Sequence, residues 1–86
     1  MRLVIERAPM RRLGDLPKTA RISLLDRLRL IAADPFATHA NVERYKGAGP
    51  NRFRLRQGQW RVIYAVDREA QEMRVQVIDT RGSVYR

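Results

Sequence analysis

The sequence predicts an α+β domain of two layers, in which a helix hairpin packs on one face of a four-stranded, mainly antiparallel sheet. Three observations lead to this prediction. The chain has 86 residues, which is the length of one small domain spanning 1–86. Its first half carries apolar residues at helical spacing. Its second half alternates apolar and polar residues as half-buried strands do, so the predicted order is β-α-α-β-β-β.

The first half of the chain is predicted to hold one short strand and two helices. Residues 3–5 are apolar and partly β-branched between charged neighbours, as in a strand. Pro9 suits the first turn of a helix, and Pro17 ends that helix. A second helix is predicted over about 18–33, where apolar residues recur every three or four positions. It ends at Asp34, because the residue before a proline is pushed out of the α region.

The second half is predicted to form a meander of three strands. Residues 36–51 are predicted to be a connection, and strands follow over 53–56, 60–67 and 73 to about 79. Alternation assigns the larger side chains of the middle strand to the core, together with Phe53 and Leu55 of the strand before it. These are Trp60, Val62, Tyr64 and Val66.

Composition bounds the function. The net charge of +9 favours a polyanionic partner, such as a nucleic acid, an acidic protein or an anionic surface. The chain has no cysteine and its only histidine is His39, which excludes thiolate metal sites, a cysteine nucleophile and histidine-based triads. No apolar run is long enough for a membrane span or a signal peptide. We therefore expect a cytoplasmic protein without a metal, cofactor or membrane.

Positive charge is concentrated in one segment. Between Arg44 and Val66 the chain has six cations and no acid. Strand alternation directs Arg54, Arg56 and Arg61 to the face of the sheet that the helices leave open. Guanidinium groups match phosphate oxygens two at a time, so this cluster indicates an anion site. The alternative is an arginine-rich composition that places arginine at every exposed strand position.

Several short motifs together resemble the RelE/ParE superfamily of bacterial toxins. They are the stretches 53–56, 58–64 and 78–86, the helix ends at Leu16-Pro17 and Ala33-Asp34-Pro35, and Tyr45-Lys46-Gly47 before the sheet. The resemblance covers nearly the whole chain. It implies the toxin of a type II toxin–antitoxin pair, with an acidic antitoxin as partner. The retained basic residues favour the RelE branch, whose members cleave messenger RNA on the ribosome without a metal.

The resemblance also implies a set of site residues. The catalytic residues would be Arg54, Arg56, Arg61, Arg81 and Tyr85. Arg44, Lys46 and Arg52 would extend the RNA-binding surface. Arg11, Arg12, Arg27 and Arg29 are predicted to form a solvated helical face, with ribosomal RNA contact as the alternative.

The chain departs from the family pattern in two places. Some family members have lysines on the second predicted strand, where this chain has Arg54 and Arg56. Guanidinium stays protonated, so neither can serve as the general base, and the titratable candidates are Tyr85, Lys46 and Asp79. Asp79 and Thr80 stand where the family often has Gly-His, and we expect Asp79 to orient Arg81. Two other readings stay open: a ParE-like toxin that inhibits DNA gyrase without catalysis, and an inactive remnant that only binds its antitoxin or nucleic acid.

Overall fold

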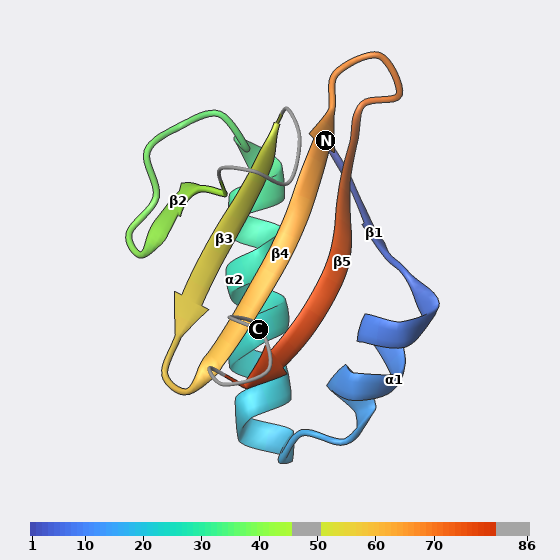
Figure 1. The fold of residues 1–86 in the computed structure, drawn as a ribbon, viewed down its shortest axis with the longest axis vertical. Helices are drawn as coiled ribbons and strands as arrows, with labels where there is room; N and C mark the ends of the chain where they lie inside the picture. Colours follow the sequence, from blue (N-terminus) through green and yellow to red (C-terminus); the bar gives the residue numbers. More distant parts are fainter. Residues whose placement is uncertain (46–50, 81–86) are drawn as a thin grey trace.

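Residues 1–45 and 51–80, which the computed structural model describes, form two helices and a five-stranded mixed sheet (Figure 1). The strand order across the sheet is β1-β5-β4-β3-β2. In chain order the elements are β1 Arg2–Ile5, α1 Arg7–Gly14, α2 Lys18–Ala33, β2 Val42–Arg44, β3 Arg52–Gln57, β4 Trp60–Asp67 and β5 Glu72–Thr80.

The fifth strand corrects the prediction of four. The connection predicted over 36–51 contains β2, which pairs antiparallel with β3 and places Val42 opposite Leu55. β2 thereby satisfies backbone groups of β3 that would otherwise lie on a free edge. At the other edge β1 pairs in parallel with β5, from Arg2 opposite Glu72 to Ile5 opposite Val75. The three remaining ladders are antiparallel, and two of them, β3 with β4 and β4 with β5, form the predicted meander.

The ends of α2 match the prediction and have clear causes. The carbonyl oxygen of Pro17 accepts a hydrogen bond from the Arg21 N–H at 2.9 Å and opens the first turn. At the other end the Asp34 N–H donates to the Ile31 carbonyl at 3.0 Å, and Asp34 leaves the helical conformation with ψ 77° ahead of Pro35. Within the described residues, neither helix has the length and apolar character needed to cross a membrane.

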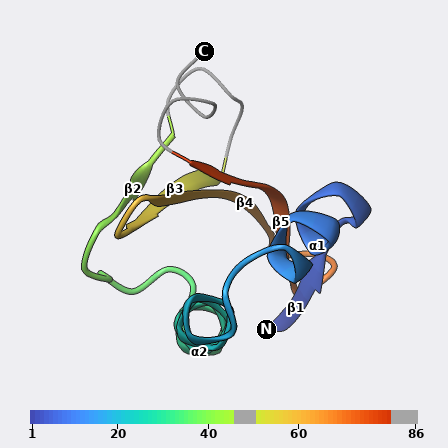
Figure 2. The same cartoon turned by 90° about the horizontal axis from the view of Figure 1, so that it is seen from below.

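The helices hold different positions relative to the sheet. Figure 2 shows α2 beneath one face, whereas α1 lies beside β5 at the edge of the sheet. β1 pairs only with the first half of β5, Glu72 to Val75, and α1 packs along the second half. The prediction that both helices lie on one face therefore holds for α2. The helix α1 also covers the second half of β5, which has no neighbour on that edge among the described strands.

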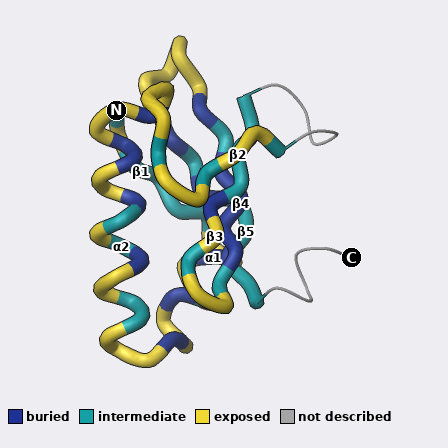
Figure 3. Tube along the Cα trace, turned by 90° about the vertical axis from the view of Figure 1, so that its left-hand side faces the viewer, coloured by how far each residue is buried: buried dark blue, intermediate teal, exposed yellow. Residues whose placement is uncertain are grey.

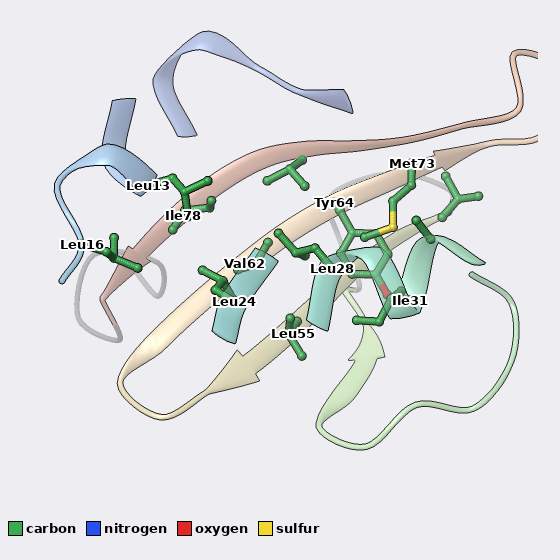
Figure 4. Packing of buried hydrophobic residues seen from close by; sticks show 13 residues of the cluster. Leu13, Leu16, Leu24, Leu28, Ile31, Leu55, Val62, Tyr64, Met73 and Ile78 are labelled. Atoms are coloured by element: carbon green, nitrogen blue, oxygen red, sulfur yellow. The ribbon is translucent and has the colours of Figure 1, made fainter. Parts of the chain in front are cut away.

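The core lies between α2 and the sheet. Alternation is confirmed, because Leu55, Val62, Tyr64 and Val66 all belong to the buried core cluster, and Figure 4 shows the first three between α2 and the sheet. Phe53 and Trp60, also predicted for the core, are half-buried and pack against this cluster. The buried positions of α2 face the sheet and its exposed positions face solvent (Figure 3). The other members of the core cluster are Leu13, Leu16, Leu24, Leu28, Ile31, Ala32, Met73, Val75 and Ile78. Residues of β3 and β4 that alternate with these core positions project from the opposite face.

Candidate functional site

The sheet face opposite α2 carries the arginine cluster predicted from strand alternation. Arg56 lies directly opposite Arg61 in the ladder between β3 and β4, and Arg54 lies opposite Ile63. Directly opposed residues share a face of a sheet, and Arg54 and Arg56 share one because they are two residues apart. No described helix covers this face in Figure 2. We call Arg54, Arg56 and Arg61 the arginine cluster.

Arg61 is held by its own hairpin. Its side chain lies close to the turn between β3 and β4, where Nη1 donates to the carbonyl oxygens of Gly58 at 2.9 Å and Trp60 at 3.0 Å. Gly58 has φ 58°, a conformation that suits glycine in a two-residue hairpin turn. Arg61 is only 8% exposed, and its Nε has no hydrogen-bond partner in the described part of the chain. A buried guanidinium with unused donors favours an anionic ligand.

Arg54 already has a partner from β2. It donates to the Glu43 carboxylate, which lies opposite it in the ladder, and its guanidinium carbon lies 5.8 Å from the centroid of the Tyr45 ring. The hydrogen bond and charge of Arg54 hold the pKa of Glu43 below its usual range, and the charge of Arg56 adds to this effect. The positive charge of Arg54 is therefore partly compensated.

Arg56 and Arg61 form the part of the cluster that lacks an ion-paired carboxylate in the described residues. Opposed residues in an antiparallel ladder have Cβ atoms about 4.5–5.5 Å apart, and like charges in that position destabilise a sheet. Among the described residues, neither side chain forms an ion pair with a carboxylate. The nearest acids in the register, Glu43 and Asp79, are paired with Arg54 and Arg12 instead. Two arginines that are direct ladder partners are thus left without a paired carboxylate in the described part of the chain.

The other predicted site residues divide into three groups. Arg52 lies opposite Ala65 and shares the open face with the cluster. Arg44 lies opposite Phe53 on the side of α2, with its guanidinium carbon 5.9 Å from the centroid of the Phe53 ring. Lys46, Arg81 and Tyr85 lie outside the described residues, and so does the expected pairing of Asp79 with Arg81.

Sequence reasoning missed the placement of Tyr45. Its N–H donates to the Arg52 carbonyl at 2.9 Å, which continues the ladder past β2 and places the Tyr45 side chain on the open face. A pocket of about 390 Å³ is lined there by Glu43, Arg44, Tyr45 and Arg54. Strand alternation would have revealed this position, but only once β2 was recognised as a strand.

Arg12 was also missed, and it corrects the prediction of a wholly solvated helical face. Its Nη2 donates to Oδ1 of Asp79 at 2.8 Å, and its guanidinium carbon lies 5.9 Å from the centroid of the Trp60 ring. Asp79 lies opposite Arg61 in the ladder between β4 and β5. Residues 12 and 79 are too far apart in the chain for any local pattern to predict this pair.

Solved structures share this arrangement of elements. A chain of the archaeal RelE–RelB complex from Pyrococcus horikoshii OT3 matches with a TM-score of 0.80 at 25% identity, over 94% of this chain and 94% of that one. The isolated E. coli RelE toxin matches with a TM-score of 0.79 at 22% identity, over 98% and 89%. For the YoeB/ParE toxin from Agrobacterium tumefaciens the values are 0.73 and 22%, over 93% and 98%. No protein-family profile and no curated protein matches the sequence.

Proposed function

We propose that this chain, which has the fold of the RelE/ParE toxins, is the toxin of a type II toxin–antitoxin pair and cleaves messenger RNA on the ribosome. The fold matches include complexes of RelE with RelB, which supports an antitoxin partner for this chain. The arginine cluster supports RNA cleavage over the alternative of gyrase inhibition without catalysis.

The observation that carries the proposal is the opposition of Arg56 and Arg61. Arg56 and Arg61 are direct partners in the ladder between β3 and β4, on the sheet face opposite α2, and among the described residues neither forms an ion pair with a carboxylate. Folding alone gains nothing from like charges in this position, whereas a phosphate group would bridge them with charge-assisted hydrogen bonds. The site therefore suits a phosphodiester.

The proposed reaction needs no metal. The ribose 2′-hydroxyl gives up its proton to a base as its oxygen attacks the adjacent phosphorus, the bond from phosphorus to the 5′-oxygen breaks, and that oxygen takes up a proton. The products are a 2′,3′-cyclic phosphate and a 5′-hydroxyl. Negative charge accumulates on the phosphorane oxygens, and fixed cations aimed at them lower the barrier. Arg56 and Arg61 are suited to this role. DNA lacks the 2′-hydroxyl and would remain intact.

The remaining parts of the machinery follow from the family resemblance. Arg81 would add a third cation at the phosphate, and Tyr85 would stack on a base or take part in proton transfer. The ribosome would position the substrate, because holding reactants in register supplies much of the acceleration. Action on the ribosome implies a cytoplasmic protein, and an acidic antitoxin would neutralise the cluster in the complex.

Induced expression tests the proposal. Primer extension on cellular messages should show breaks within codons after induction of the wild-type chain. Arg61→Ala should lower cleavage by about 10² to 10³, as loss of one transition-state donor does in other enzymes. Arg29→Ala is the matched control, because it removes the same charge from an exposed position on α2, and it should cleave like the wild type. Thermal unfolding of both purified variants verifies that they fold.

Two outcomes would overturn the nuclease proposal. Equal cleavage by the wild type and Arg61→Ala would remove the cluster from the reaction. Intact messages accompanied by gyrase–DNA adducts and an SOS response would instead identify a gyrase inhibitor, the other activity that the family resemblance allows.

A further inference from the structure

Among the described residues, Asp79 lies next to two cations, Arg12 and Arg61, and forms an ion pair with Arg12 alone. It lies directly opposite Arg61 in the ladder between β4 and β5, where Cβ atoms are about 4.5–5.5 Å apart. Its Oδ1 nevertheless accepts hydrogen bonds from Arg12 at 2.8 Å and from the Thr80 N–H, also at 2.8 Å. The carboxylate thus pairs with Arg12 of α1 and forms no ion pair with Arg61, its partner in the ladder.

Arg12 is well placed to hold Asp79 in this orientation. It comes from α1, which packs along the half of β5 that contains Asp79, and the two side chains help to line a pocket of about 260 Å³ between these elements. The Arg12 guanidinium also lies 5.9 Å from the centroid of the Trp60 ring, a cation–π distance. Two contacts therefore fix a side chain that would otherwise sample many rotamers.

We propose that Arg12 is a positioning residue that holds the Asp79 carboxylate away from Arg61 and so keeps the Arg61 guanidinium available for phosphate. This inference rests on the proposed function, because it gives Arg61 its anionic ligand. Without Arg12, the carboxylate would turn to the cation opposite it. An Arg61 paired with Asp79 would bind RNA less tightly, because a phosphate would have to displace an internal anion.

If the ion pair between Arg12 and Asp79 only joined α1 to β5, a different result would be expected. Loss of that ion pair would lower stability in the Arg12 and Asp79 variants alike, and removal of Asp79 would not restore binding. The proposed role predicts rescue instead, because a carboxylate that is absent cannot occupy Arg61. The two explanations are separated by a double-mutant cycle.

The cycle uses Arg12→Ala, Asp79→Asn and the double variant, with Arg11→Ala as the matched control. Arg11 is the exposed neighbour of Arg12 on α1, and its loss removes the same charge without touching Asp79. The probe is a fluorescein-labelled single-stranded RNA, followed by anisotropy. Arg12→Ala should weaken binding about tenfold and Arg11→Ala about twofold or less, because only the first releases the carboxylate.

The decisive comparison is the effect of Asp79→Asn in two backgrounds. It should change the affinity of the wild type by about twofold or less, and it should restore the Arg12→Ala variant to within about twofold of the wild type. Equal losses in Arg11→Ala and Arg12→Ala, or a double variant as weak as Arg12→Ala alone, would overturn the proposal.

A second measurement does not depend on RNA. In ¹⁵N NMR spectra the Arg61 guanidinium signals should shift in Arg12→Ala and return toward their wild-type positions in the double variant. Unchanged Arg61 signals in Arg12→Ala would overturn the inference even if RNA binding were normal. Shifted signals in a protein whose wild type binds no RNA would support the role of Arg12 and count against the proposed function.

Discussion

The ring of Phe53 stacks on the ring of Tyr64, its direct partner across the ladder between β3 and β4, with centroids 5.4 Å apart and 21° between the planes. Tyr64 is fully buried beneath α2, and within the described residues its hydroxyl has no hydrogen-bond partner. The aromatic pair therefore fills the core at the expense of one unsatisfied polar group. Burial raises the pKa of Tyr64 to about 12.

Tyr64→Phe should raise the free energy of unfolding by about 1 kcal/mol at neutral pH, because it removes the unpaired hydroxyl and keeps the stacked ring. Urea unfolding measures this change. Tyr45→Phe, which alters a half-buried ring at the edge of the sheet, is the control and should change stability less. A destabilised Tyr64→Phe would show that the hydroxyl has a partner.

The same tyrosine predicts a loss of stability at alkaline pH. Its pKa is about 12 in the folded state and 10 ordinarily, so the folded state binds the proton more tightly. The contribution of the protonated Tyr64 to the free energy of unfolding is therefore present below pH 10 and is lost as the pH rises toward 12. Urea unfolding across this range should show a shallower decline in Tyr64→Phe than in the wild type. Parallel declines would contradict the raised pKa.

Two leucines of α2 offer a matched pair for the core. Leu28 is fully buried and Leu30 is 59% exposed, although they are two residues apart in one helix. Leu28→Ala should cost about 2–5 kcal/mol of unfolding free energy, since it leaves a cavity between α2 and the sheet. Leu30→Ala should cost about 0.5 kcal/mol or less. Similar costs at both positions would mean that α2 packs in another orientation.

Glu72 predicts a response to acid. Hydrogen bonds from Arg2 of β1 and from Arg74 hold the pKa of this carboxyl below its ordinary value of 4.5. A carboxyl whose pKa is lowered in the folded state stabilises the fold at pH values above its ordinary pKa. This stabilisation is lost as the pH falls through the folded-state pKa. Glu72→Gln should therefore be less stable than the wild type at pH 7, and the difference should shrink in acid. Glu69→Gln, in the exposed turn, should show no such convergence.

Glu43 predicts an effect on RNA binding. Glu43→Gln removes the carboxylate that compensates Arg54, so the arginine cluster gains effective positive charge. Affinity for single-stranded RNA should rise about two- to fivefold, and the dependence of binding on salt should steepen, because the positive charge of Arg54 is then less compensated. Anisotropy titrations over a salt series measure both. Glu69→Gln makes the same charge change away from the cluster, and an equal gain there would indicate a general charge effect.

The sequence predicted what depends on local pattern. The bounds of α2 followed from periodicity and from two prolines, and the facing of Val62, Tyr64 and Arg61 followed from alternation. β2 escaped prediction because three residues within a long connection give too short a pattern, and its existence depends on the edge of β3. The parallel pairing of β1 depends on contacts across the whole chain.

The candidate site divides in the same way. Arg54, Arg56 and Arg61 could be grouped from one hairpin, because strand geometry relates neighbours along two paired segments. The contacts that modulate them come from elsewhere: Glu43 from an unpredicted strand, and Arg12 from a helix that packs on β5. Such contacts depend on tertiary packing, which no spacing within a single sequence encodes.

The net charge of +9 makes the stability of this protein depend on whether an anionic partner is bound. Mutual repulsion among its cations weakens the folded chain whenever it is alone, and any polyanion seated over Arg56 and Arg61 relieves that repulsion. An acidic companion would therefore slow unfolding and proteolysis as well as block the face. Dissociation of this acidic partner would expose the cations and, at the same time, make the chain unfold and be degraded faster.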